Sequence, residues 1–157
     1  MKTDQVFKAP MEKSTDFKFD AQVADVFNDM VGRSVPYYLE MQRMMSEIIP
    51  DYVRPNTSIY DLGCSTGTTL LSLDKLLDQT VRFVGVDSSA EMIENSCSNF
   101  RNNELTRPYD LITADLYKPF EIKNASVVIL CLTLQFIRPL YRQKMLESIY
   151  QQMNDGA

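Results

Sequence analysis

The chain has 157 residues, and 45% of them are hydrophobic, which suits the core of one domain or of part of one. Its net charge of −5 offers no basic field for phosphates, so we expect no direct binding to nucleic acid. The sequence contains no histidine, which excludes the commonest general base, the commonest metal ligand and every Ser/His or Cys/His nucleophile.

The cysteines and the apolar runs indicate the compartment. Cys64, Cys97 and Cys131 are odd in number and widely spaced, with no CxxC pair and no zinc-binding spacing. The densest apolar stretch, residues 127–132, is too short to cross a bilayer, and the N-terminus lacks the apolar run of a signal peptide. We therefore expect a reduced, cytoplasmic protein that does not associate with membranes.

The N-terminal third predicts a polar arm followed by a helical cap. Residues 1–18 are mixed and polar, as in an extended arm. Residues 19–55 form the cap, whose first helix places apolar residues at helical spacing, namely Val23, Val26, Phe27 and Met30. The second helix is expected over residues 38–49, and Pro50 is expected to close it.

Residues 56–157 alternate between strand and helix patterns. Strands are expected at residues 58–62, 81–86, 109–114 and 126–132. Helices follow each turn, the last over residues 139–153, and they are expected to bury Leu70, Leu73, Leu77, Ile93, Cys97, Phe100, Leu146, Ile149, Tyr150 and Met153. A capping box within Ser88-Ser89-Ala90-Glu91 starts the helix after the second strand. The alternation predicts an α/β fold with a Rossmann-like, doubly wound parallel sheet.

The fourth strand is the most apolar of the set, which favours burial between two neighbours in a doubly wound sheet. Four strands supply no second neighbour for it, so we expect the C-terminal strands of the sheet to be missing from this chain. The fourth strand should then be an exposed edge, or should pair with another copy.

Small residues follow the first strand, in the segment Tyr60-Asp61-Leu62-Gly63-Cys64-Ser65-Thr66-Gly67. Open α/β sheets bind ligands at the carboxyl ends of their strands, and small residues let a ligand approach the backbone. The spacing fits neither the G-x-G-x-x-G dinucleotide fingerprint nor a P-loop, because no lysine follows until Lys75. The D-x-G-x-S-x-G arrangement resembles motif I of class I methyltransferases that use S-adenosylmethionine (SAM), a ligand without phosphate.

Acidic residues follow the next two strands. Asp87 ends the second strand, twenty residues after Gly67, where a carboxylate can accept hydrogen bonds from both ribose hydroxyls of an adenosine. Asp87 and Ser88 could instead simply open the next helix. Asp115 follows the third strand, where the methyltransferase resemblance implies a carboxylate near the adenine. With motif I, these positions favour a nucleoside site.

Further segments resemble the carboxy-S-adenosyl-L-methionine (carboxy-SAM) synthases. They are Phe19-Asp20, Val23-Ala24, Val26-Phe27, Asp29-Met30, Arg33-Ser34-Val35-Pro36 with Tyr38, Ala90-Glu91-Met92-Ile93-Glu94 and Thr133-Leu134-Gln135-Phe136. The resemblance runs from about residue 7 to the end and identifies the chain as the N-terminal portion of such a synthase. It implies a homodimer that converts SAM and prephenate to carboxy-SAM and phenylpyruvate.

The resemblance also implies how the product is used and how it is made. A partner enzyme uses carboxy-SAM to modify the wobble uridine of certain tRNAs (cmo5U34). The positive sulfur stabilises the carbanion left when the methyl group loses a proton, so no metal is implied. The arginine that recognises the extra carboxylate is expected beyond Ala157, which leaves SAM and carboxy-SAM as alternative ligands and the catalytic residues unknown.

Carried over by position, the resemblance implies nine cofactor-binding residues: Tyr38, Gly63, Cys64, Ser65, Asp87, Ser88, Asp115, Leu116 and Cys131. Cys131 stands where the family usually shows an asparagine, so an amide is lost near the ligand. Arg33 is either an anion contact or an ordinary surface arginine.

Two other functions are left open. The chain could belong to an ordinary SAM-dependent methyltransferase acting on tRNA or on a small molecule. It could also be a non-catalytic subunit with the SAM-binding fold that supports another enzyme. The nucleoside that the protein carries, and its turnover of prephenate, would distinguish the three.

Overall fold

The computed structural model describes residues 21–156, so the N-terminal arm predicted for residues 1–18 lies outside the described residues. Four parallel strands form one sheet: β1 (Ser58–Leu62), β2 (Arg82–Asp87), β3 (Tyr109–Thr113) and β4 (Ala125–Ile129). Their order is β3-β2-β1-β4, so the chain moves outward from β1 and then crosses back to its other side. This order creates a switch point between β1 and β4, as expected of a Rossmann-like sheet.

Five α-helices accompany the sheet in the described chain: α1 (Ala21–Ser34), α2 (Tyr38–Tyr52), α3 (Thr68–Leu73), α4 (Ala90–Asn102) and α5 (Pro139–Gln152). Two short 3-10 turns, η1 (Asp74–Leu76) and η2 (Leu134–Phe136), follow α3 and β4. No helix within residues 21–156 has the length and apolar character needed to cross a membrane.

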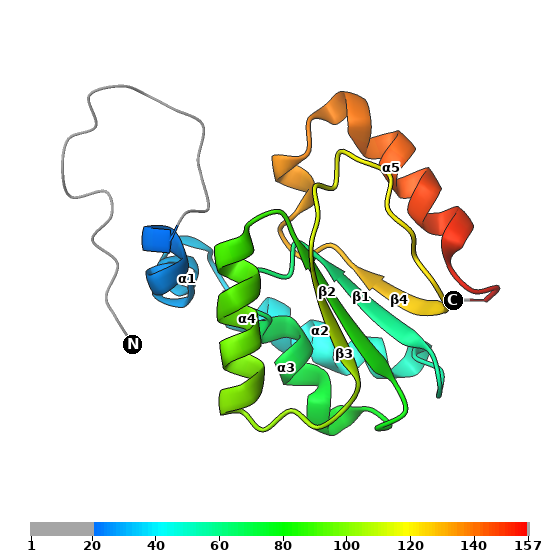
Figure 1. Ribbon diagram of the computed structural model, residues 1–157, viewed down its shortest axis with the longest axis horizontal. Helices are drawn as coiled ribbons and strands as arrows, with labels where there is room; N and C mark the ends of the chain where they lie inside the picture. The colour runs from blue at the N-terminus through cyan, green and yellow to red at the C-terminus, as the bar shows by residue number, and fades with distance from the viewer. Residues whose placement is uncertain (1–20, 157) are drawn as a thin grey trace.

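Helices cover both faces of the sheet (Figure 1), with α5 on one side and α3 and α4 on the other. Side chains alternate between the faces along each strand, because successive residues of a strand point in opposite directions. Ile59 and Phe83 pack with residues of α2, α3 and α4, whereas Tyr60 and Val84 pack beneath α5. The predicted α/β architecture with helices on both sides is therefore confirmed.

Strand β4 lies at the edge of the described sheet. It pairs with β1 along one side. On its other side the described residues make a single parallel bridge, from Ala125 to Met153, supported by Asn154 N–H donating to Ala125 O at 2.9 Å. The prediction of an edge position for the fourth strand is confirmed.

The fourth strand is shorter than predicted. It ends at Ile129, and the predicted extension to Leu132 is wrong. Leu132 adopts a left-handed backbone with φ 55°, which breaks the extended chain. The turn is held by Thr133 Oγ1, which donates to Leu62 O at 2.7 Å and so joins the ends of β4 and β1.

Two predictions about the helices also need correction. Helix α2 does not stop before Pro50 but runs to Tyr52, since a proline in the last turn removes only one late hydrogen bond. In α5, Ile149 is buried, but Leu146 and Tyr150 are 40% and 79% exposed, so the helix presents a different face to the sheet than expected.

Helix α4 begins at the expected serine pair. Ser89 is its N-cap and accepts a hydrogen bond from Met92 N–H at 3.2 Å. Glu91 accepts a hydrogen bond from the Ser89 hydroxyl instead of closing a reciprocal capping box. The buried face consists of Met92, Ser96 and Phe100, so Phe100 was predicted correctly and Ile93 and Cys97 are only half-buried.

Candidate functional site

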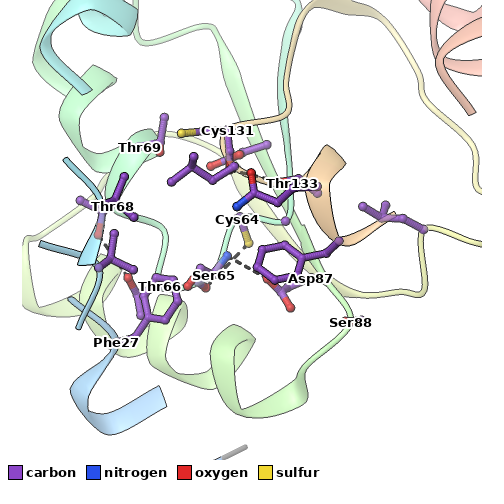
Figure 2. A pocket seen from close by; sticks show the side chains of 18 of the residues that line it. Phe27, Cys64, Ser65, Thr66, Thr68, Thr69, Asp87, Ser88, Cys131 and Thr133 are labelled. Atoms are coloured by element: carbon purple, nitrogen blue, oxygen red, sulfur yellow. Dashed lines mark hydrogen bonds between the residues drawn. The ribbon is translucent and has the colours of Figure 1, made fainter. Parts of the chain in front are cut away.

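A cavity of about 670 Å³ opens at the carboxyl ends of the strands, within the size range of small-molecule sites. It is lined by residues of α1, α2 and α3 and by the segments that follow each strand. All nine residues predicted to bind the cofactor line this one cavity: Tyr38, Gly63, Cys64, Ser65, Asp87, Ser88, Asp115, Leu116 and Cys131. Figure 2 shows Thr69 and Cys131 towards one end of the cavity and Asp87 and Ser88 towards the other.

The backbone N–H groups of the turn after β1 donate hydrogen bonds to acceptors within the protein. The N–H groups of Gly63 and Cys64 both donate to Val86 O, at 2.7 and 3.0 Å. Ser65 N–H donates to Asp87 Oδ2 at 2.9 Å, and Gly67 N–H donates to Cys64 O at 2.8 Å. A phosphate cradle needs free amides that point at the ligand. With these amides already bonded, the turn suits a ligand without phosphate.

Two glycines of the turn are required by its shape. Gly63 and Gly67 have φ of 84° and 75°, in the left-handed region that favours glycine. A Cβ on Gly67 would lie 2.5 Å from the ring of Phe100, and one on Gly63 would collide with Thr133. Ser65, between them, adopts φ 51° although it carries a side chain. The turn therefore lies tightly against α4 and against the segment after β4.

Asp87 was predicted either to accept hydrogen bonds from a ribose or to open the next helix, and the structure shows its contact with the start of α4. Its Oδ1 accepts from Ser89 N–H and its Oδ2 from Ser65 N–H, both at 2.9 Å, so it joins the turn to the start of α4. It also lines the cavity. A carboxylate offers about four lone-pair sites, so capacity is left for a ligand hydroxyl. Burial raises its pKa, and the amide hydrogen bonds from Ser89, Ser65 and Ser88 oppose that rise.

Asp115 and Leu116 follow β3 on the same rim. Asp115 is exposed, and its Oδ1 accepts from Tyr117 N–H at 2.9 Å in a local turn. Leu116 is half-buried and packs against the core beneath α5. These two residues therefore supply an acceptor at the mouth of the cavity and an apolar surface beside it.

Asp61 belongs to the motif I segment but is not among the nine residues predicted to bind the cofactor. Asp61 is 2% exposed and lines the cavity. Within residues 21–156 nothing donates a hydrogen bond to its carboxylate. Burial, and then the negative charge of Asp87, raise its pKa to about 7. Burial, followed by the charge of Asp61, likewise raises the pKa of Cys131 to about 11.

Gln42 of α2 was missed by sequence reasoning. It is 7% exposed and lines the cavity. Its Nε2 donates to Thr69 Oγ1 at 3.2 Å and lies 4.0 Å from Cys131 Sγ. An amide is thus present beside Cys131, although Cys131 itself brings none. A glutamine in the middle of an amphipathic helix carries no sequence signal of this placement.

Apolar side chains of α1 also line the cavity, among them Phe27, Met30 and Val31. The helical spacing predicted that Phe27 and Met30 share a face but not what that face contacts; the side chains of Val23 and Val26 lie outside the described residues. Arg33 forms an ion pair with Asp29 at 2.9 Å and is not among the described lining residues. The surface interpretation of Arg33 therefore holds.

The charged side chains in the described lining of the cavity are all acidic. Its described lining carries three carboxylates, on Asp61, Asp87 and Asp115, and no lysine or arginine. Such a lining favours a cationic ligand over an anionic one. Among residues 21–156, no three His, Cys, Asp or Glu side chains gather closely enough to hold a metal ion.

Known proteins match this chain along its length. The relative from Methylococcus capsulatus, a carboxy-S-adenosyl-L-methionine synthase, is 40% identical over 158 residues, covering all of this chain and 65% of the relative. The carboxy-S-adenosyl-L-methionine synthase of Idiomarina loihiensis is 41% identical, over 98% of this chain and 64% of its own length. The resemblance predicted from the sequence is confirmed, and the chain spans slightly less than two thirds of these relatives.

Solved structures agree on the fold. An S-adenosylmethionine-dependent methyltransferase from Clostridium acetobutylicum superposes with a TM-score of 0.63 at 19% identity, over 83% of this chain and 52% of that one. A SAM-dependent methyltransferase from Aquifex aeolicus gives 0.58 at 15% identity, over 84% and 68% of the two chains. The family model described as a methyltransferase domain matches residues 59–156, which include the sheet and most of the cavity. The chain therefore belongs to the methyltransferase-domain family.

Proposed function

We propose that this chain is the adenosine-binding part of a carboxy-SAM synthase, which converts SAM and prephenate to carboxy-SAM, phenylpyruvate and water. The observation that carries the proposal is the joint placement of all nine expected contact residues around one cavity. The 40% identity to a carboxy-SAM synthase over the whole chain supports it. The ligand is SAM or carboxy-SAM, and the proposed chemistry involves no metal.

The residues of the cavity fit such a ligand. Asp87 is the acceptor for the ribose hydroxyls, and Asp115 with Leu116 contacts the adenine. The turn from Gly63 to Ser65 lets the ligand lie against the backbone, without free amides that would favour a phosphate. The carboxylates of the lining complement the positive charge on the sulfur of the ligand. That positive charge would stabilise a carbanion on the adjacent carbon.

The nucleoside carried by the protein tests this function. The protein is purified at its full encoded length, and the nucleoside released on denaturation is identified by mass spectrometry. We expect a species heavier than SAM by one carbon dioxide, and turnover of prephenate to phenylpyruvate when SAM is added. SAM alone, without prephenate turnover, would instead indicate an ordinary methyltransferase.

A matched pair of variants separates catalysis from a supporting role. Asp87→Ala removes the acceptor for the ribose and should lower the affinity for SAM at least about tenfold, because hydrogen bonds to charged groups are strong. Asp110→Ala alters an exposed aspartate of β3 that pairs with Arg82, and should leave binding and turnover unchanged. Prephenate turnover that persists undiminished in Asp87→Ala would contradict the proposed site.

Three further proposals follow from the same family. We propose a homodimer, a cytoplasmic location and a role in tRNA wobble-uridine modification through a partner enzyme that uses the product. The three cysteines are free, which fits a reducing compartment. The net charge of −5 fits a protein that supplies a small molecule and does not itself hold tRNA.

A further inference from the structure

Two polar side chains of α4 hold carbonyl groups of the turn after β1. Ser96 Oγ donates to Ser65 O at 3.0 Å. Asn99 Nδ2 donates to Thr66 O at 2.9 Å. A carbonyl oxygen can only accept a hydrogen bond, so the direction of both bonds is fixed. Ser65 and Thr66 line the cavity, whereas its described lining includes no residue of α4. The two side chains of α4 therefore act on a ligand through the turn and not by contact.

Ser65 is the residue of the turn that most needs such support. Its φ of 51° lies in the left-handed region, where a side chain costs free energy, and the other two left-handed residues of the turn are glycines. A residue keeps such a conformation when the contacts around it overdetermine it. The Ser65 N–H donates to Asp87 Oδ2 at 2.9 Å, and its hydroxyl donates to Met92 Sδ at 3.4 Å. With the bond from Ser96 to its carbonyl oxygen, Ser65 is held on every polar group.

The buried face of α4 fits closely against the turn. Met92, Ser96 and Phe100 recur every four residues and form this face. A Cβ on Gly67 would lie 2.5 Å from the Phe100 ring and 2.7 Å from Ser96 Oγ, so the turn and the helix are in close contact. Ser96 is fully buried, and a buried hydroxyl is costly unless it is hydrogen-bonded. The acceptor of its hydrogen bond is Ser65 O, which belongs to the turn and not to its own helix.

We propose that Ser96 and Asn99 are positioning residues for the nucleoside. By holding two carbonyl groups, they keep the turn in the shape that receives the ligand before any ligand arrives. A preorganised site binds more tightly, because less ordering is left to be done on binding. Since the Ser65 N–H also holds Asp87 Oδ2, a turn that relaxed would release the proposed ribose acceptor as well. This inference rests on the proposed function and extends it to two residues that do not line the described cavity.

Hydrogen exchange in the ligand-free protein of full encoded length tests whether α4 holds the turn. In Ser96→Ala, the Ser65 amide should exchange with deuterium at least about threefold faster, because the turn opens locally more often. The amides of β1 should keep their rates. Ser98→Ala makes the same change at an exposed position of α4 and should alter neither. Residue-resolved NMR measures these rates. Unchanged exchange at Ser65, or an equal acceleration throughout β1, would overturn the proposal.

Calorimetry with S-adenosylhomocysteine tests the consequence for binding. Ser96→Ala and Asn99→Leu should each weaken binding about threefold to tenfold, which is the range expected for one lost hydrogen bond. Ser98→Ala and Asn102→Leu are the matched controls on exposed positions of the same helix, and both should bind as the original protein does. Full affinity in both Ser96→Ala and Asn99→Leu would overturn the positioning role and leave the proposed function intact.

A second background separates positioning from packing. Glycine adopts the left-handed conformation without steric cost, so the turn of a Ser65→Gly protein depends less on its support. Adding Ser96→Ala to that protein should weaken binding of S-adenosylhomocysteine by less than about twofold. A loss as large as in the original background would show that Ser96 acts through packing alone, and would overturn the proposal. If the original protein bound no S-adenosylhomocysteine, the proposed function would fail, and the positioning role with it.

Discussion

At the scale of single residues, Asp61 combines deep burial with the lack of any cationic neighbour in the described cavity. The titratable groups around it are Asp87, Tyr38, Cys64 and Cys131, none of which is positively charged. Its pKa of about 7 lies well above the value of about 4 expected in the unfolded chain. The folded protein therefore binds a proton on Asp61 over a pH range in which the unfolded chain has released it.

We predict that this carboxylate makes the ligand-free protein less stable as pH rises. Between about pH 4 and about pH 7 the folded state holds the extra proton, so the free energy of unfolding falls with rising pH. Asp61→Asn should remove the fall and raise the free energy of unfolding at pH 8 by as much as about 4 kcal/mol. Urea unfolding at both ends of this range measures it, with the exposed Asp110→Asn as control.

Site residues that belong to a backbone motif could be predicted from the sequence. Those that reach the cavity only through the packing of distant elements could not. Gly63 and Gly67 are recognisable because their positive φ demands glycine at fixed spacing. Gln42 is not, because it reaches the cavity only when α2 packs against α3 and against the segment after β4. A single polar residue in a helix does not indicate which neighbour it will contact.

At the scale of elements, the connections around the sheet depend on one buried arginine. Arg107, just before β3, donates from Nε to Asp74 Oδ1 at 2.6 Å and from Nη1 to Val81 O at 3.4 Å. Its guanidinium also lies 4.2 Å from the centre of the Phe83 ring. The arginine thus holds η1, the start of β2 and the start of β3 together.

We predict that this arginine is a major contributor to stability. Arg107→Met keeps the volume but leaves Asp74 and several carbonyls without their donor, and should lower the free energy of unfolding by about 3 kcal/mol. Arg82→Met breaks the exposed ion pair with Asp110 and should cost less than about 1 kcal/mol. Equal losses in guanidinium unfolding would show that the buried network adds nothing.

Element types followed from sequence, but their ends did not. The first strand, residues 58–62, was predicted with both ends correct, because turn residues flank it closely. The fourth strand was predicted too long, since Leu130 and Leu132 continue its apolar run beyond the point where the chain turns. That turn depends on the hydrogen bond between Thr133 and Leu62, a long-range contact that local patterns do not contain.

At the scale of the whole molecule, the strands of the sheet differ in how many of their sides are hydrogen-bonded to a neighbouring strand. β1 lies between β2 and β4, whereas β4 has a full partner on one side only within residues 21–156. We predict that all amides of β1 exchange slowly with solvent deuterium, while roughly half of those in β4 exchange fast. Residue-resolved exchange measured by NMR tests this, and uniformly slow exchange throughout β4 would contradict it.

The described lining of the cavity lies entirely between Phe27 and Ile137, with the edge strand β4 included in that span. A ribosome that makes the protein therefore delivers every one of these residues before it reaches α5. None of the described lining residues is therefore contributed by α5 itself, which instead packs against the core that includes Tyr60 and Val84. A ligand bound in the cavity would therefore stabilise the strands and helices that precede α5 directly, and α5 only through the core that they share.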